Sequence, residues 1–360
     1  MARAILLAFA EEERKKNAFK RARRLRREVS DPLGLSAKEF EAQFRLTKEA
    51  FNELCREVIP LLRTRKRSTM IRDELKIAAA LTFFACGAYQ RGMGNSSIHN
   101  MSQPSFSHCL EEVTNALNSD VILKKYIKFP SNGRVRDAVI ADFKNISGMP
   151  GVIGCVGGTH IAIVKPVENA NAYLNSKLYH SLNVLAICDS HMNITYIDAS
   201  YGGAAHDNFI WTQSPIKNYL ERLNLNGDSC WLLGDSGFTQ KAYMMTPILK
   251  YEEGSPEEYY TKIHHRTHSI MQRCIVTLKS RWKCLLPHRV LHYNPAKAGK
   301  IVNACAVLNN IANSYNIAIP KLSAADEIAI ERSQLPDDVG DSPNTGRSML
   351  VQLLWAARRE

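Results

Sequence analysis

The chain has 360 residues, of which 45% are hydrophobic and 23% charged, and this composition predicts a folded globular protein large enough for two domains. Lysine and arginine total 47 against 35 acidic residues, and the formal net charge of +12 favours a polyanionic partner, either nucleic acid or an acidic membrane surface. A soluble protein with a basic tail is the alternative. No run approaches the roughly 18 apolar residues of a membrane span, so we expect no membrane segment.

The nine cysteines and the first residues indicate an intracellular protein. The cysteines are scattered, odd in number and without a CxxC pair, which predicts reduced and mostly buried thiols. The short apolar run at 5–10 leads directly into three glutamates, so we expect no signal peptide.

Residues 1–30 form a basic arm, with ten lysines and arginines against four glutamates. Helix-forming residues dominate it, so we expect a solvated helix that contacts phosphates or directs nuclear import; a merely soluble face is the alternative. A second basic cluster comprises Arg63, Arg65, Lys66 and Arg67, and the same two interpretations apply to it.

Residues 31–125 are expected to be all-helical and helix-turn-helix-like. Ser36 and Glu39 have the spacing of a capping box. An apolar helix over 74–89 is followed by two glycines and then by a helix that Ser102 would cap. This last helix is expected to present several polar side chains outward, namely Ser105, Ser107, His108, Glu111 and Glu112. Because glutamates are poor phosphate partners, protein-directed binding stays an alternative to DNA binding.

Residues 145–320 change to an α/β pattern. Strand-like runs and helix-like runs alternate here, which favours a mixed sheet with helices on its faces. The expected strands are 152–164, 182–189, 194–199 and 231–234, and the expected helices are 208–223, about 268–285 and 295–313. Residues 321–360 are expected to be an acidic linker and a terminal amphipathic helix from 348 to 358.

Three aspartates end strand-like runs in this region. Asp235 follows the run 231–234 and stands beside glycines, Asp207 lies at a strand-to-helix junction, and Asp189 ends another strand. Converging carboxylates of this kind hold Mg²⁺ or Mn²⁺ in phosphodiester-cleaving enzymes. Asp and Gly at strand ends are also ordinary turn residues, so the pattern alone leaves both interpretations open.

The order of short motifs resembles the PIF/Harbinger transposase-derived nucleases. Segment 151–161 reads GVIGCVGGTHI, where the family reads GVIG-x-hydrophobe-DGTHI. Further matches follow in the same order: HSLNV at 180–184, HD at 206–207, WLLGDSGF at 231–238, HHRTH at 264–268, LKSRWKCL at 278–285 and ACAVLNNI at 304–311. The resemblance runs from about 31 to 314 and implies an RNase H-like core preceded by a helical, helix-turn-helix-like domain. It also implies a divalent-metal (Mg or Mn) nuclease ancestry with DNA as the ancestral substrate.

The resemblance also implies an incomplete catalytic site. The family's second catalytic Asp falls on Asp235 and an accessory metal-site Asp on Asp207. The first catalytic Asp falls on Gly157, which has no ligand side chain, and the catalytic Glu falls on Gln272, a neutral oxygen donor. The formal charge of these four positions drops from −4 to −2, so we expect weak metal binding. Basic residues on the same stretch as Gln272 are candidates for phosphate contacts, with a solvated face as the alternative: Lys279, Arg281 and Lys283.

Two functional hypotheses follow. The first is a transposase-derived, DNA- or chromatin-associated adaptor in the nucleus, and also in the cytoplasm, that has lost efficient cleavage. The second is an active divalent-metal DNA endonuclease that uses Asp207 and Asp235 with substitute ligands. A non-functional transposon relic is a weaker third hypothesis. By resemblance to the family, a separate Myb-like DNA-binding protein is an expected partner. We expect His160, His180 and His206 to have structural, hydrogen-bonded roles, because no zinc-like spacing joins them.

Overall fold

The computed structural model describes residues 2–63, 71–87, 99–333 and 345–358. The chain forms two compact units, residues 1–117 and residues 118–360. Arg65, Lys66 and Arg67 of the predicted basic cluster, the end of the predicted helix 74–89, Gly92 and Gly94 lie outside the described residues. None of the described helices is long and apolar enough to cross a membrane.

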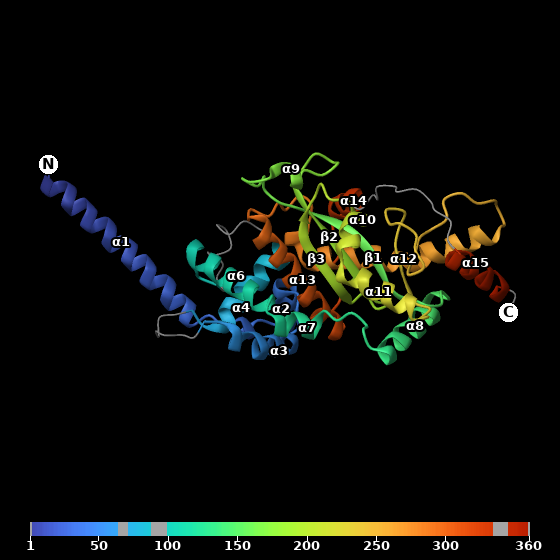
Figure 1. Ribbon diagram of the computed structural model, residues 1–360. Coiled ribbons are helices and arrows are strands. Elements are labelled where there is room, and N and C mark those ends of the chain that lie inside the picture. The colour runs from blue at the N-terminus through green and yellow to red at the C-terminus, as the bar shows by residue number, and fades with distance from the viewer. Residues whose placement is uncertain (1, 64–70, 88–98, 334–344, 359–360) are drawn as a thin grey trace. The chain divides into compact units, whose positions relative to one another are not determined.

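The described part of the first unit consists of helices (Figure 1). They are α1 (Ala2–Glu28), η1 (Pro32–Gly34), α2 (Ala37–Phe44), α3 (Lys48–Val58), η2 (Ile59–Leu61), α4 (Asp73–Cys86) and α6 (Gln103–Leu117). The predicted capping box is present, since Ser36 Oγ accepts from the Glu39 amide and the Glu39 carboxylate accepts from the Ser36 amide. Phe40 packs on Phe44 and Phe51 with ring centroids 4.7 and 5.4 Å apart.

One expected surface residue of α6 faces another helix instead. The carboxylate of Glu112 lies 3.2 Å from the ammonium of Lys76, whose side chain is 4% exposed and also pairs with Asp73. The Glu112 carboxylate accepts from the Arg63 amide as well. Glu112 therefore binds α6 to α4, while Glu111 and His108 are exposed as expected.

The second unit is built around a five-stranded mixed sheet of order β3-β2-β1-β4-β5. The strands are β1 (Val152–Ala162), β2 (Ser181–Cys188), β3 (Ile194–Gly202), β4 (Trp231–Leu233) and β5 (Met244–Met245). The first three are antiparallel neighbours, whereas β4 runs parallel to β1 and β5 runs parallel to β4. This arrangement, with helices on both faces, confirms the predicted RNase H-like α/β fold.

Alternation along the strands directs side chains to two separate helical layers. Leu185 and Ile187 of β2 join one buried cluster with α10 (Asp207–Gln213) and α11 (Pro215–Leu225). On the opposite face Cys155 of β1 contacts the Thr267 carbonyl of α12 (Pro256–Arg281). The other helices of this unit are α7 (Asp120–Tyr126), α8 (Gly133–Ser147), α9 (Ala170–Tyr173), η3 (Lys283–Leu285), α13 (Pro295–Ser314), α14 (Ala324–Ser333) and α15 (Thr345–Ala357).

Two predicted helices differ from the structure. The predicted helix 208–223 is two helices, because Ser214 caps α11 and Pro215 stands in its first turn, where a proline removes a hydrogen bond of α10. The predicted helix 268–285 begins much earlier, at Pro256, and ends at Arg281. Its first half is polar in sequence, so apolar periodicity does not reveal it.

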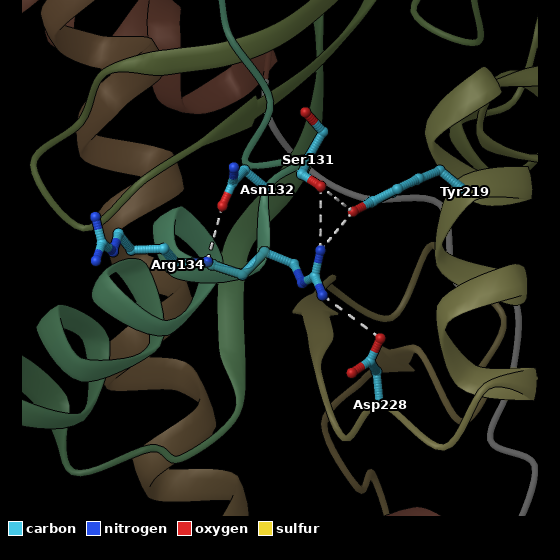
Figure 2. Close-up of polar contacts among 6 residues, drawn as sticks. Ser131, Asn132, Arg134, Tyr219 and Asp228 are labelled. Carbon is cyan, nitrogen blue, oxygen red and sulfur yellow. Dashed lines mark hydrogen bonds and ion pairs between the residues drawn. The ribbon is translucent and has the colours of Figure 1, made fainter.

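A polar cluster fastens α8 to α11 (Figure 2). The Arg136 guanidinium donates to the Tyr219 hydroxyl at 2.7 Å and to the Ser131 carbonyl at 3.2 Å, and it pairs with Asp228 at 3.5 Å. The Tyr219 hydroxyl donates to the same Ser131 carbonyl at 2.8 Å. These contacts fix the segment that precedes α8, where Asn132 caps the helix through the Arg134 amide.

Candidate functional site

Asp207 lies directly over the centre of β1. His206 caps α10, and the Asn183 amide on β2 donates to the Asp207 carboxylate at 2.6 Å and to the Ala205 carbonyl at 2.8 Å. A Cβ placed on Gly158 would overlap the Asp207 carboxylate. Glycine is therefore required at 158 to let this carboxylate approach the strand.

Asp235 leaves the sheet beside the same stretch of β1. Leu233 of β4 pairs with Cys155, so Asp235, two residues further on, comes level with Gly157. The carboxylate of Asp235 accepts from the Gly237 amide at 2.9 Å, which fixes the turn after β4. The sequence thus predicts correctly that Asp235 stands at a strand end next to glycines.

Two hydrogen bonds join the Asp207 and Asp235 segments. The Asn208 side chain donates to the Thr239 hydroxyl at 3.0 Å and accepts from the Thr239 amide at 3.1 Å. Asn208 follows Asp207 directly, and Thr239 lies four residues after Asp235. The segments of both aspartates therefore belong to one hydrogen-bonded frame beside β1. Asp207 lies on the Gly158 face of this strand, whereas a Cβ on Gly157 would point to the opposite face, toward Met271 of α12. The sequence motifs include Asn183 and Gly158, and Asn208 directly follows the HD motif, but these positioning roles are visible only in the structure.

Gly157 and Gln272, the two positions at which the family resemblance leads us to expect acids, contribute no acid to this frame. A Cβ on Gly157 would lie 3.0 Å from Met271 Cγ of α12, so the methionine packs against the position where an acid side chain would begin. Gln272, next to Met271, is exposed and carries a neutral amide. Asp189 does not substitute, because its carboxylate accepts from the His191 and Asn193 amides in the β2–β3 turn.

The residues present do not fit a two-cation site. Each of Asp207 and Asp235 already accepts a hydrogen bond from the protein through one oxygen. Across the part of the chain that the structure describes, no group of three or more His, Cys, Asp or Glu side chains is placed to hold a metal ion. Two dications opposed by two carboxylates lack half of the compensating charge of a four-acid site.

Helix α12 is fastened to β1 on both sides of Gly157. The His268 ring nitrogen Nε2 lies 2.8 Å from the Val156 carbonyl, and the Lys279 ammonium donates to the His160 carbonyl at 3.3 Å. Lys279 has no exposed surface, and burial lowers its pKa to about 7. The backbone of β1 beside the site is thereby anchored to α12 at two carbonyls.

The structure corrects the assignment of Lys279 and Arg281 to nucleic acid. Arg281 is 3% exposed, and its guanidinium donates to the Asn309 and Asn313 side chains and to the Ile317 carbonyl. Both cations serve interior hydrogen bonds, which a charge pattern in sequence does not distinguish from a surface stripe. Lys283 keeps 28% of its side chain exposed, 3.9 Å from Asp326, and Arg63 is exposed, so their phosphate contacts stay predictions.

Two of the site histidines have the expected structural roles. His160 Nδ1 lies 3.0 Å from the Ser181 hydroxyl, and His206 Nδ1 accepts from the Asn208 amide at 3.2 Å. The acceptor role of His206 places its proton on Nε2 when the ring is neutral. Neither geometry resembles a metal ligand set.

Comparison with known proteins agrees with this architecture. A model of the DDE superfamily endonucleases matches residues 156–310, from within β1 to within α13, a range that includes the whole candidate site. The protein named "Putative nuclease HARBI1" in Xenopus laevis is 35% identical over 274 residues, 75% of this chain and 76% of that protein. The chain belongs to the Harbinger transposase-derived nuclease family.

Proteins similar to this Harbinger-family chain occur in both animals and plants. The human protein of the same name is 35% identical over 261 residues, 72% of each chain. "Antagonist of like heterochromatin protein 1" of Arabidopsis thaliana is 20% identical over 291 residues, 76% of this chain and 72% of that protein. No solved structure matches this Harbinger-family chain.

Proposed function

We propose that this Harbinger-family protein binds DNA or chromatin through a nuclease-type scaffold and has lost efficient cleavage. The observation that carries the proposal is the pair of positions flanking the aspartate frame, Gly157 and Gln272, which supply no carboxylate. In active nucleases of this type, bound cations stabilise the attacking and leaving oxygens, and they need acidic ligands to stay bound.

The packing around Gly157 supports the loss of the catalytic acid at this position, because a neighbouring side chain packs against the glycine. Because Met271 Cγ would lie 3.0 Å from a Cβ at position 157, an aspartate restored there would require the methionine side chain to shift by a few tenths of an ångström. The polar frame of Asp207, Asn183, Asn208 and Thr239 keeps its hydrogen bonds, which is consistent with a scaffold that still serves a binding role.

An adaptor role in the nucleus, and also in the cytoplasm, fits the basic composition of the chain and its net charge of +12. The family is nuclease-like, so DNA is the expected ligand. The name of the Arabidopsis relative refers to heterochromatin, and this supports chromatin as the setting. A Myb-like protein is the proposed partner for sequence-specific binding.

An active divalent-metal endonuclease is the second candidate. The observation that favours it is that the segments of Asp207 and Asp235 are joined by hydrogen bonds and that Gly158 gives clearance for the Asp207 carboxylate. In that case Asp207 and Asp235 would hold Mg²⁺ or Mn²⁺, with a further ligand supplied by a partner or by substrate.

Calorimetric titration of Mn²⁺ distinguishes the two candidates. We expect no saturable binding to the wild-type protein below about 1 mM, which corresponds to roughly −4 kcal/mol of binding free energy. A variant combining Gly157→Asp, Gln272→Glu and Met271→Ala should gain saturable binding, and adding Asp235→Ala should remove it. DNA binding by fluorescence anisotropy should be unchanged in Asp235→Ala alone.

Two results would contradict the adaptor proposal. Saturable Mn²⁺ binding to the wild-type protein that Asp235→Ala removes, together with Mn²⁺-dependent DNA cleavage that the same variant abolishes, would establish the endonuclease. Loss of DNA binding in Asp235→Ala would contradict the adaptor proposal.

A further inference from the structure

The connection between β1 and β2 presents one apolar side chain in an unfavourable backbone conformation. Leu178 is 82% exposed and has a φ of 62°. The left-handed region disfavours residues other than glycine, asparagine and aspartate, and water disfavours an exposed leucine. Neither local preference nor burial accounts for Leu178, and strain of this kind persists mainly at functional positions.

The turn that carries Leu178 is rigidly built. Asn175 is 2% exposed, and its side-chain carbonyl accepts from the amides of Lys177 and Tyr179 at 3.0 and 3.2 Å. Its side-chain amide donates to the Ser181 hydroxyl at 2.9 Å. The Leu178 amide donates to the Asn175 carbonyl at 3.0 Å, which closes the turn.

The same contacts tie this turn to the strand that passes under Asp207. Ser181 Oγ lies 3.0 Å from His160 Nδ1, and His160 pairs with Asn183, the residue that positions Asp207. The motif residues His160 and Ser181 thus support a turn as well as the site. Figure 1 shows this connection, together with α9, extending past the ends of the strands.

The segment of chain around Leu178 holds a lysine and no acidic residue. From 170 to 188 the sequence contains no aspartate or glutamate, and the neighbouring Lys177 is exposed. Proteins that bend duplex DNA combine cationic side chains with an apolar wedge, often leucine, that enters between base pairs and unstacks them. A rigid turn is suited to this role, because the wedge does not have to be ordered when DNA binds.

We propose that Leu178 is a wedge that unstacks a base step of duplex DNA lying over the Asp207 segment, with Lys177 on a neighbouring phosphate. This proposal rests on the proposed function, in that it requires the protein to bind DNA. It assigns the turn 175–179 to DNA deformation and predicts a preference for pyrimidine–purine steps such as TA, which unstack most readily.

The test uses the full-length protein and a duplex with 2-aminopurine at a central TA step. Fluorescence anisotropy measures affinity, and 2-aminopurine emission measures unstacking. Leu178→Asn removes the apolar group and suits the left-handed backbone, so its melting temperature should equal or exceed that of the wild type. The matched control is Leu225→Asn, because Leu225 is 83% exposed and ends α11 shortly before β4, at the opposite end of the sheet.

We expect the wild type and Leu225→Asn to raise 2-aminopurine emission and to prefer the TA duplex over an A-tract duplex about tenfold. Leu178→Asn should lose both effects while keeping its binding to the A-tract duplex. Unstacking by Leu178→Asn at the wild-type level would overturn the wedge. Wild-type binding without unstacking would also overturn it and leave the proposed function standing, whereas absence of all DNA binding would overturn both.

Discussion

At the residue scale, the motif cations act as interior anchors. Lys279 is fully buried, and its ammonium donates to a backbone carbonyl of β1. An ammonium in such a place loses hydration, so burial shifts its pKa downward to about 7. Lys279 therefore lies next to the candidate site because it anchors β1, and its lowered pKa follows from the burial that this role requires.

Lys279 predicts a pH dependence of stability. Its pKa of about 7 in the folded protein lies below the unfolded value near 10.4, so between these values the unfolded chain binds more protons. Stability from this group is lowest below pH 7 and rises with pH by up to about 1.4 kcal/mol per unit. Urea unfolding at pH 7, 8 and 9 should show this rise in the wild type relative to Lys279→Met.

The difference in unfolding free energy between the wild type and Lys279→Met isolates the titration of Lys279. Cysteine thiols and tyrosines that titrate in the same pH range contribute equally to both proteins. Removal of the hydrogen bond to the His160 carbonyl gives Lys279→Met a constant offset, and only the slope is diagnostic. Parallel pH profiles for wild type and variant would show that Lys279 stays protonated in the folded protein.

At the element scale, asparagine side chains attach α13 to the edge of the sheet. β3 is an edge strand, and the Asn310 side chain accepts from the Ile194 amide at 2.9 Å and donates to the Ile194 carbonyl at 2.7 Å. It also donates to the carbonyl of Tyr126 at 2.8 Å. One side chain thus replaces a missing strand partner and joins α7 to the sheet.

Asn310→Ala should lower the free energy of unfolding by about 3 kcal/mol, because it leaves buried backbone groups of Ile194 without a partner. The matched control is Asn303→Ala on the same helix, where the side chain donates to Asn118 at 3.1 Å and is only partly buried. We expect a decrease of less than about 1 kcal/mol there. Chemical denaturation measures both, and equal decreases would contradict the edge-pairing role.

The elements differ in how far sequence predicts them. The strands around Val156, Leu185 and Ile197 are predictable because each is a short run rich in apolar and β-branched residues, and the helix α13 is predictable from its apolar helical pattern. The first half of α12 is not, since its buried face includes His264 and His268, which read as polar. The candidate site also has a part that sequence predicts and a part that it does not. The order of the motifs points to Asp207, Asp235 and the glycine at 157. The contact of Met271 with Gly157 depends on packing between α12 and β1, which sequence does not reveal.

At the scale of the whole molecule, charge is unevenly distributed along the chain. Residues 14–27 of α1 contain nine of the 47 basic residues and no acidic residue. Three of the nine form ion pairs within the helix, Lys15 with Glu11 at 2.8 Å, Lys16 with Glu12 at 2.7 Å and Arg24 with Glu28 at 2.7 Å. The predicted basic arm is a helix, and most of its basic side chains are exposed.

The proposed loss of two acids at the candidate site would also make the protein less negative where it faces DNA. In a four-acid site without metal, the carboxylates repel a DNA backbone, and bound cations must neutralise them before the phosphates approach. If only Asp207 and Asp235 remain, as we propose, this repulsion would be halved, and the proposed DNA binding would depend less on metal and more on basic surfaces such as α1.

Neutralising α1 therefore predicts a change in the salt dependence of DNA binding. Replacing the exposed residues Arg14, Lys20, Arg21 and Arg26 with glutamine should weaken binding and reduce the slope of log K against log salt by roughly 0.9 for each phosphate that the variant no longer neutralises. Because these side chains are exposed, the melting temperature should stay within about 1–2 °C of the wild type. The matched control replaces Lys15 and Glu11 together with glutamine, which leaves the net charge unchanged and should leave the slope unchanged. A wild-type slope in the fourfold variant would assign phosphate binding to other surfaces, with Lys283 and Arg63 as the next residues to neutralise.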